Sequence, residues 1–308
     1  MDATPVDIAI EDTAPTDSGG RALHLSLLPV NGEVRTAGVP ATNGHHNGHA
    51  FSRYPADTRT TGVTVSVIIP ALNEQHNIGW VLERMPSTVD EVILVDGYST
   101  DRTVEIARAM RPDIVVVGQA SRGKGEALRA GFQAATSDVI VMIDADGSMD
   151  PGEIHRYVTP LMNGYDLVKG SRFLDGGGST DLTPIRRFGS KAFVHMTNAL
   201  FFVRFTDLCY GFCSFRRECL NGLALTAQGF EIETEIAVHA AKAQLRIAEV
   251  PSMERERRSG VSKLHAFRDG RRVLRTLVRE RLSSRNRPVV DPISERALSD
   301  WRAAAETT

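Results

Sequence analysis

Between residues 63 and 282, short apolar runs rich in β-branched residues alternate with segments whose apolar positions recur every three or four residues. The first pattern is typical of buried strands and the second of amphipathic helices. Their regular alternation predicts an α/β fold with a mostly parallel sheet flanked by helices. The predicted strands are 63–69, 91–95, 114–117 and 139–143, and the predicted helices are about 74–84, 101–110 and 126–135.

The two ends of the chain lack this pattern. Residues 1–61 are rich in Ala, Thr, Gly, Asn and Pro without a sustained period, which predicts a disordered N-terminal tail. Residues 283–308 contain Pro288 and Pro292 and are predicted to form a C-terminal tail with a short helix at about 297–305. We therefore expect one domain, 62–282, which is long enough to bury a core and leave an open cleft.

The composition limits the classes of function. The formal net charge is -2 at pH 7, which gives no reason to expect a nucleic-acid partner. No run approaches the roughly 18 apolar residues needed to cross a bilayer, so we expect a protein that is soluble or lies on a membrane surface. Cys209, Cys213 and Cys219 lack zinc-type spacing and are interpreted as buried thiols of a cytoplasmic protein.

Acidic residues follow three of the predicted strands. Glu74 lies just beyond the first strand, Asp96 follows the second, and Asp144 and Asp146 follow the fourth. Loops at the carboxyl ends of parallel strands converge, and ligands of open α/β sheets bind there. Asp144 and Asp146 are separated by one residue, so an extended backbone would bring two carboxylates to the same side. The pattern predicts a site for Mg2+ or Mn2+ that keeps coordination positions for the phosphates of a sugar diphosphate.

Eight short motifs follow one another along residues 63 to 280. They are Pro70-Ala71-Leu72-Asn73-Glu74, Asp96-Gly97-Tyr98-Ser99-Thr100-Asp101, Gly123-Lys124-Gly125, Asp144-Ala145-Asp146, Lys169-Gly170-Ser171-Arg172, Asp207-Leu208-Cys209-Tyr210-Gly211-Phe212, Glu231-Ile232-Glu233 and Arg257-Arg258-Ser259-Gly260-Val261-Ser262-Lys263. In this order they resemble the motifs of family 2 glycosyltransferases, and most closely those of the dolichyl-phosphate mannosyltransferase branch. The resemblance implies a GT-A fold, which is Rossmann-like, and a nucleotide diphosphate sugar as donor.

The resemblance also implies roles for single residues on the donor side. Lys124 would contact the substrate, while Asp144 and Asp146 would hold ribose, metal and diphosphate. The base and ribose would be held by Pro70, Leu72, Glu74 and Asp96. Phosphates would be clamped by Arg172, Arg186 and Arg257, with Lys263 as an added point charge. A guanidinium suits this role because its planar fork matches phosphate oxygens.

Two positions leave the chemistry open. The branch usually has Gln two residues beyond the second aspartate as a further metal contact, whereas this chain has Ser148, which can reach the ion through water. By resemblance Asp207 approaches the acceptor. It would act as a general base for a hydroxyl acceptor but would only orient a phosphate acceptor, which is already largely ionised because its second pKa is about 6.

Two predicted helices combine apolar and basic residues. Segment 185–205 includes Phe188, Phe201 and Phe202, and segment 264–282 places Phe267 among several arginines. Such helices either pack on the sheet or lie in a bilayer interface, where basic residues are drawn to anionic lipid. Beside the predicted acceptor loop they favour a lipid-phosphate acceptor and a peripheral contact with the inner face of the cell membrane.

Three functions fit these observations. The leading hypothesis is inverting transfer of a hexose from GDP-mannose or a UDP-sugar to polyprenyl phosphate. A second hypothesis keeps the donor and replaces the lipid with a soluble sugar or a small-molecule hydroxyl. A third, from a different class, is a non-catalytic module that binds nucleotide sugars.

Overall fold

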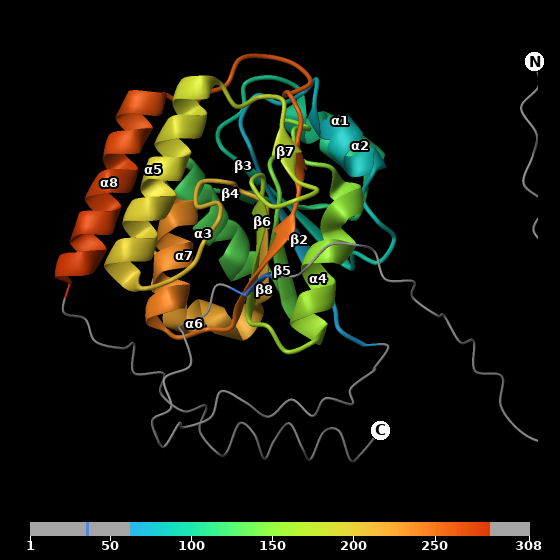
Figure 1. The fold of residues 1–308 in the computed structure, drawn as a ribbon. Helices are drawn as coiled ribbons and strands as arrows, with labels where there is room; N and C mark the ends of the chain where they lie inside the picture. Colours follow the sequence, from blue (N-terminus) through green and yellow to red (C-terminus); the bar gives the residue numbers. More distant parts are fainter. Residues whose placement is uncertain (1–34, 37–61, 284–308) are drawn as a thin grey trace, which may run out of the picture. The chain divides into compact units, whose positions relative to one another are not determined.

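The computed structural model describes residues 35–36 and 62–283 of the 308-residue chain (Figure 1). Eight strands form the main sheet in the order β1-β9-β6-β8-β5-β2-β3-β4. Their bounds are Arg35–Thr36 (β1), Val65–Ala71 (β2), Glu91–Asp96 (β3), Val115–Gly118 (β4), Val139–Met142 (β5), Leu167–Ser171 (β6), Cys213–Arg216 (β8) and Ile247–Pro251 (β9). A second, two-stranded sheet pairs β7 (Gly178–Ser179) with β10 (Met253–Glu254).

One half of the main sheet is the parallel sheet that the sequence predicts. Strands β5, β2, β3 and β4 are adjacent and parallel, so their carboxyl ends meet at one edge. Three of them, β2, β3 and β5, are almost wholly buried, because helices cover both faces of the sheet. In the other half β6 and β9 are parallel to each other, whereas β8 is antiparallel to both β5 and β6.

Helices cover the two faces of the sheet in separate layers. One face packs against α1 (Ile78–Glu83), α2 (Thr103–Met110) and α4 (Ile154–Met162), and the other against α3 (Lys124–Ala134), α5 (Pro184–Phe201) and α7 (Ile232–Lys242). The last helix, α8 (Ala266–Leu282), packs on α5 and α7 outside the second layer, where Val273 and Leu277 are buried against Val238 (Figure 1). Short helical turns complete the fold at Pro151–Glu153 (η1), Arg217–Cys219 (η2) and Leu220–Leu223 (α6).

The predicted elements are found with small shifts at their ends. The predicted helix 74–84 starts only at Ile78, because the preceding residues form a turn in which the Glu74 carbonyl accepts hydrogen bonds from the Asn77 and Ile78 amides. The fourth strand ends at Met142 rather than at Ile143. The mostly parallel sheet flanked by helices is confirmed. The predicted tails, 1–61 and 283–308, and the helix at 297–305 fall almost wholly outside the described residues.

Candidate active site

A cavity of about 300 Å3 opens at the carboxyl ends of the parallel strands. It lies where four βα loops converge, as expected for an open parallel sheet. Eight of the thirteen predicted site residues line it: Pro70, Leu72, Glu74, Lys124, Asp144, Asp146, Arg257 and Lys263. The other five, Asp96, Ser148, Arg172, Arg186 and Asp207, do not line this cavity.

The acidic end of the cavity is built around Lys124, the first residue of α3. Its Nζ lies 2.6 Å from Asp144 Oδ1 and 2.8 Å from Glu233 Oε1. A Cβ on Gly211 would come within 3.0 Å of that Nζ and 3.3 Å of the Glu233 carboxylate, so glycine at this position leaves room for the pair. Burial raises the pKa of Asp144 to about 6, Lys124 opposes that rise, and the charges of Asp146 and Glu233 add to it.

The donor set at Asp144 and Asp146 fits a divalent cation. Carboxylate oxygens are hard ligands, and the charges of Asp146 and Glu233, which add to the rise that burial causes in the pKa of Asp144, are a repulsion that a cation would relieve. Asp146 Oδ1 accepts a hydrogen bond from the Ser148 amide at 3.0 Å, whereas Oδ2 has only Arg257 at 3.9 Å among the described residues. Ser148 therefore contributes its backbone amide to Asp146, and its side chain lies outside the cavity lining.

Glu74, which also lines the cavity, holds two cations from the segment that leads to α8. Arg257 Nη2 donates to both Glu74 oxygens at 2.6 and 2.7 Å, and Lys263 Nζ lies 3.5 Å from Oε1 and also donates to the Leu72 carbonyl. Asn77 completes the set with a hydrogen bond of 2.6 Å to Glu74 Oε2. Burial opposes the charge of Arg257, but Glu74 and Asp146 outweigh it and raise the pKa of the guanidinium.

Arg172 lies in a different place from the one expected. We expected it to converge with Asp144, but it is buried beyond the end of β6 and pairs with Asp207 through Nε at 2.7 Å and Nη2 at 3.0 Å. Its Nη1 donates to Glu254 at 3.1 Å. Burial disfavours the charge of Arg172, yet Asp207 and Glu254 raise its pKa well above the usual range. Because each nitrogen has a carboxylate partner and the side chain is only 3% exposed, this guanidinium is held by the protein interior and does not face the cavity.

Asp207 is likewise committed to protein partners. Its side chain is fully buried, and besides Arg172 it accepts hydrogen bonds from the Arg172 and Cys209 amides. Glu249 lies behind it and accepts from the Thr206 amide and hydroxyl and from the Asp207 amide. Burial raises the pKa of Glu249 to about 7 despite these hydrogen bonds. Asp207 is therefore placed as a structural partner of Arg172 rather than at the cavity wall.

Asp96 and Arg186, the remaining two predicted residues, are both half-buried outside the cavity lining. Asp96 ends β3 and accepts a hydrogen bond from the Ser99 amide, next to Gly97, which does line the cavity. Arg186 lies in the first turn of α5 and pairs with Asp181 at 2.7 Å.

Several cavity residues were missed by the sequence analysis. Arg268 and Arg272, taken there as part of a basic helix face, line the cavity from α8, and Arg122, Gln119 and Phe230 line it from loops. The signal for the α8 pair was the spacing of four residues on one helix face. The sequence does not indicate that this helix face points toward the strand ends, because its direction depends on how α8 packs on α5 and α7.

A second group that could hold a metal lies between α7 and α8. Ligand atoms of Glu235, His239 and Glu280 lie within 4.8 Å of one another. Both carboxylates already have cationic partners, Arg279 at 2.7 Å from Glu235 and Lys242 at 3.0 Å from Glu280. The group is therefore charge-compensated by the protein and is interpreted as a clamp between the two helices.

The mostly parallel sheet flanked by helices is a GT-A-like fold, and its cavity at the carboxyl ends of the parallel strands contains a carboxylate pair and basic side chains. The chain belongs to glycosyl transferase family 2, whose family model matches residues 66–223, and it is a glycosyltransferase.

Relatives and solved structures agree with this membership. The dolichyl-phosphate hexose transferase of Haloferax volcanii is 31% identical, with 75% of this chain and 99% of that protein covered. The polyprenol monophosphomannose synthase of Mycolicibacterium smegmatis is 33% identical over 68% of this chain and 84% of that protein. Glucosyl-3-phosphoglycerate synthase from Mycobacterium tuberculosis, solved with Mn2+, UDP and phosphoglyceric acid, superposes with a TM-score of 0.58 at 26% identity, covering 71% of this chain and 79% of that one.

Within the described ranges, no helix combines the length and apolar character that crossing a membrane requires.

Proposed function

We propose that this glycosyltransferase moves a hexose from a nucleotide diphosphate sugar, GDP-mannose or a UDP-sugar, to polyprenyl phosphate, with inversion at the anomeric carbon and with Mg2+ or Mn2+. The observation that carries the proposal is the composition of the cavity. Asp144 and Asp146 lie there with six cationic side chains, which suits a ligand that carries phosphates and a metal. The six are Arg122, Lys124, Arg257, Lys263, Arg268 and Arg272.

In this proposal Asp144 and Asp146 would hold the divalent ion, which would supply Lewis-acid stabilisation of the diphosphate leaving group. Arg257 and Lys263 exchange Glu74 for the diphosphate oxygens, and Lys124 fixes Asp144 in place. Pro70, Leu72 and Glu74 hold the base and ribose, together with Asp96 at the end of β3. The superposed synthase with Mn2+ and UDP supports this type of donor site.

A phosphate acceptor agrees with the position of Asp207. The attack of a phosphate monoester needs no general base, because the nucleophile is already largely ionised above its second pKa of about 6. Asp207 is fully buried and held by Arg172, which suits a residue that shapes the adjoining loop and not one that takes a proton from the acceptor. We therefore assign Asp207 and Arg172 to positioning, and Arg186 to the surface near the acceptor.

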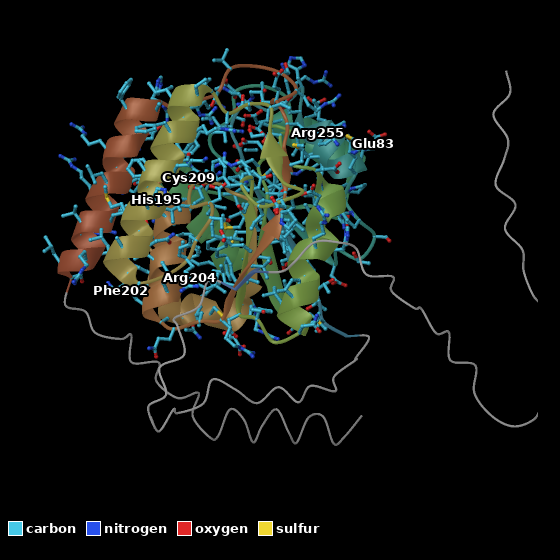
Figure 2. All side chains as sticks on the ribbon, in the orientation of Figure 1. Glu83, His195, Phe202, Arg204, Cys209 and Arg255 are labelled. Carbon is cyan, nitrogen blue, oxygen red and sulfur yellow. The ribbon has the colours of Figure 1, made fainter. Side chains whose placement is uncertain are left out.

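A lipid-linked acceptor is supported by the surface of α5 and α8, which lie side by side (Figure 1). Ile185 and Phe188 at the start of α5 and Phe267 at the start of α8 are 60%, 77% and 83% exposed. Figure 2 shows Phe202, a further exposed aromatic residue, near Arg204 at the other end of α5. Exposed aromatic and basic residues on neighbouring helices suit a peripheral contact with an anionic bilayer. The names of the two relatives point to the same class of acceptor.

The donor site is tested by calorimetry with UDP, GDP, ADP and CDP in the presence and absence of Mn2+. We expect at least one nucleotide to bind, and binding to depend on the metal. Asp146→Ala should abolish the metal-dependent part, because Asp146 has an oxygen without a hydrogen bond from the described residues. Asp150→Ala, an aspartate outside the cavity lining, is the matched control. Metal-independent binding of every nucleotide would contradict the site assignment.

The acceptor is tested by activity with a short-chain polyprenyl phosphate in detergent and by sedimentation with phosphatidylglycerol vesicles. We expect salt-sensitive vesicle binding that Phe188→Ser with Phe267→Ser weakens. Full activity on a soluble acceptor without lipid would instead support the second candidate, a soluble phosphorylated or hydroxyl acceptor. The specific observation in its favour is the superposed glucosyl-3-phosphoglycerate synthase, which was solved with phosphoglyceric acid.

A further inference from the structure

Gln119 has no hydrogen-bond partner for its side chain among the described residues, although the residue is only 7% exposed. It lies directly after β4 and lines the cavity. An amide that makes no hydrogen bond to the protein keeps both its donor and its acceptor available to a ligand. Its amide is not enclosed by protein, so a molecule inside the cavity can satisfy it.

The backbone around Gln119 is held firmly by its neighbours. The Tyr98 hydroxyl donates to the Gln119 carbonyl at 2.8 Å, and Tyr98 itself takes a positive φ of 67°. Gly97 lies beside the Gln119 side chain, since a Cβ on Gly97 would be 3.7 Å from Oε1. That Cβ would also lie 3.1 Å from the Ala71 carbonyl oxygen and 3.3 Å from the Leu72 Cβ, so glycine allows the two strand ends to pack closely here. Leu72, Gly97 and Gln119 all line the cavity, so a flat group that lies on this wall would meet the Gln119 amide at its edge.

The order of the strands gives the distance from this amide to the acidic pair. Asp144 follows β5 and Gln119 follows β4, and two strands, β2 and β3, lie between them. Neighbouring strands are about 4.8 Å apart, so the two strand ends are separated by roughly 14 Å. A nucleoside diphosphate in an extended form reaches over such a distance from its phosphates through ribose to base. If the diphosphate lies at Asp144 and Asp146, the base lies at Gln119.

We infer that Gln119 selects the nucleobase of the donor by a two-point contact between its amide and the edge of the base. Glutamine presents a donor and an acceptor side by side, and nucleobases display matching neighbouring acceptors and donors on their edges. The orientation of the amide and the shape of the adjoining cavity wall decide which edge fits. The inference rests on the proposed donor site and adds the residue that determines specificity.

The test measures dissociation constants of UDP, GDP, ADP and CDP with Mn2+ for the wild type and for Gln119→Leu, which keeps the volume and removes both contacts. We expect the wild type to prefer one base, and the variant to bind that nucleotide about 10- to 100-fold more weakly, as for loss of a bidentate base contact. The other nucleotides should change by less than about threefold, because they lack the contact in the wild type. The dissociation constants of the four nucleotides should therefore become more similar in the variant.

Gln133→Leu, a change of an exposed glutamine on α3, is the matched control and should leave all four constants unchanged. Gln119→Glu replaces the amide donor by an acceptor and adds a negative charge, and it should also weaken binding of the preferred nucleotide, so the test does not depend on one variant folding normally. An unchanged ranking in both Gln119 variants overturns the inference while the donor site stands. A wild type that binds no nucleoside diphosphate overturns the proposed function itself.

Discussion

The sequence analysis gave Arg257 and Arg172 the same role, as phosphate contacts, but the two arginines pair with carboxylates in different surroundings. Arg257 pairs with Glu74 on the cavity wall, with side chains that are 15% and 9% exposed. Arg172 pairs with Asp207 in the interior, with side chains that are 3% and 0% exposed. A ligand can replace Glu74 as the partner of Arg257, because the ligand enters where the pair is accessible. The interior pair has no such competitor, so the two arginines serve different purposes.

The largest expected effect is on the stability of the interior pair. Asp207→Ala leaves Arg172 buried with Glu254 as its main remaining partner, and breaking one partner of a buried pair costs about 3–5 kcal/mol. Urea unfolding followed by circular dichroism measures this loss. The double variant Arg172→Met with Asp207→Leu should recover part of the stability, because no unpaired charge remains. A loss of less than about 1 kcal/mol in Asp207→Ala would mean that the pair is not buried as described.

The free energy of unfolding should depend on pH because of Glu249, the carboxylate behind the Arg172–Asp207 pair. Burial raises the pKa of Glu249 from its ordinary value of 4.5 to about 7. The folded state therefore holds this proton more tightly than the unfolded state. Stability from this group is fully present below about pH 4.5 and is lost as the pH rises toward about 7, by up to about 3 kcal/mol.

Glu249→Gln is the matched variant for this prediction. Its Oε1 can accept from the Thr206 and Asp207 amides, and its Nε2 can donate to the Thr206 hydroxyl. The difference in unfolding free energy between wild type and variant should therefore change with pH in favour of the variant above about pH 7. Parallel pH profiles for the two proteins would show that Glu249 does not titrate in this range.

Buried charged residues explain why some strands were predicted from the sequence and others were not. The four strands before Asp144 are apolar runs, and all four were predicted at nearly their observed bounds. Strands β6 and β9 contain Lys169 and Glu249, which are buried, so their apolar pattern is interrupted and no strand was predicted there. Tertiary partners, the Tyr210 carbonyl for Lys169 and the Thr206–Asp207 backbone for Glu249, make such charges tolerable.

The residues of the candidate site were also predictable only in part. Residues directly after parallel strands, such as Glu74 and Asp144, were predictable because the topology brings these strand ends together. Arg172 was expected beside them from motif order alone, but motif order does not show which carboxylate a guanidinium will face. Arg272 was only one of the several arginines of the predicted helix 264–282, because its place on the cavity wall depends on the packing of α8.

The cavity pair should respond in the opposite way to the interior pair. Arg257→Ala should lower stability by no more than about 1.5 kcal/mol, because Glu74 keeps Asn77 and Lys263 as partners. Affinity for a nucleoside diphosphate with Mn2+ should fall about 10- to 100-fold, the value of a charge-assisted hydrogen bond. Urea unfolding and calorimetry on one preparation give both numbers. A large stability loss with unchanged affinity would place Arg257 with the interior group.

The smallest effect is expected at Lys263, whose side chain is 44% exposed and lies near the same carboxylate. Lys263→Ala should change stability by no more than about 0.5 kcal/mol, because exposed ion pairs contribute little. Nucleotide affinity should fall only about two- to fivefold near 50 mM salt, and this difference should shrink near 500 mM, because screening weakens exposed charges most. Calorimetry at the two salt concentrations, with Arg257→Ala measured alongside, checks the prediction. The loss of nucleotide affinity in Arg257→Ala should persist at high salt, since that guanidinium is more buried. If the affinity losses of the two variants were equally sensitive to salt, the difference in exposure between Lys263 and Arg257 would not determine their contributions to binding.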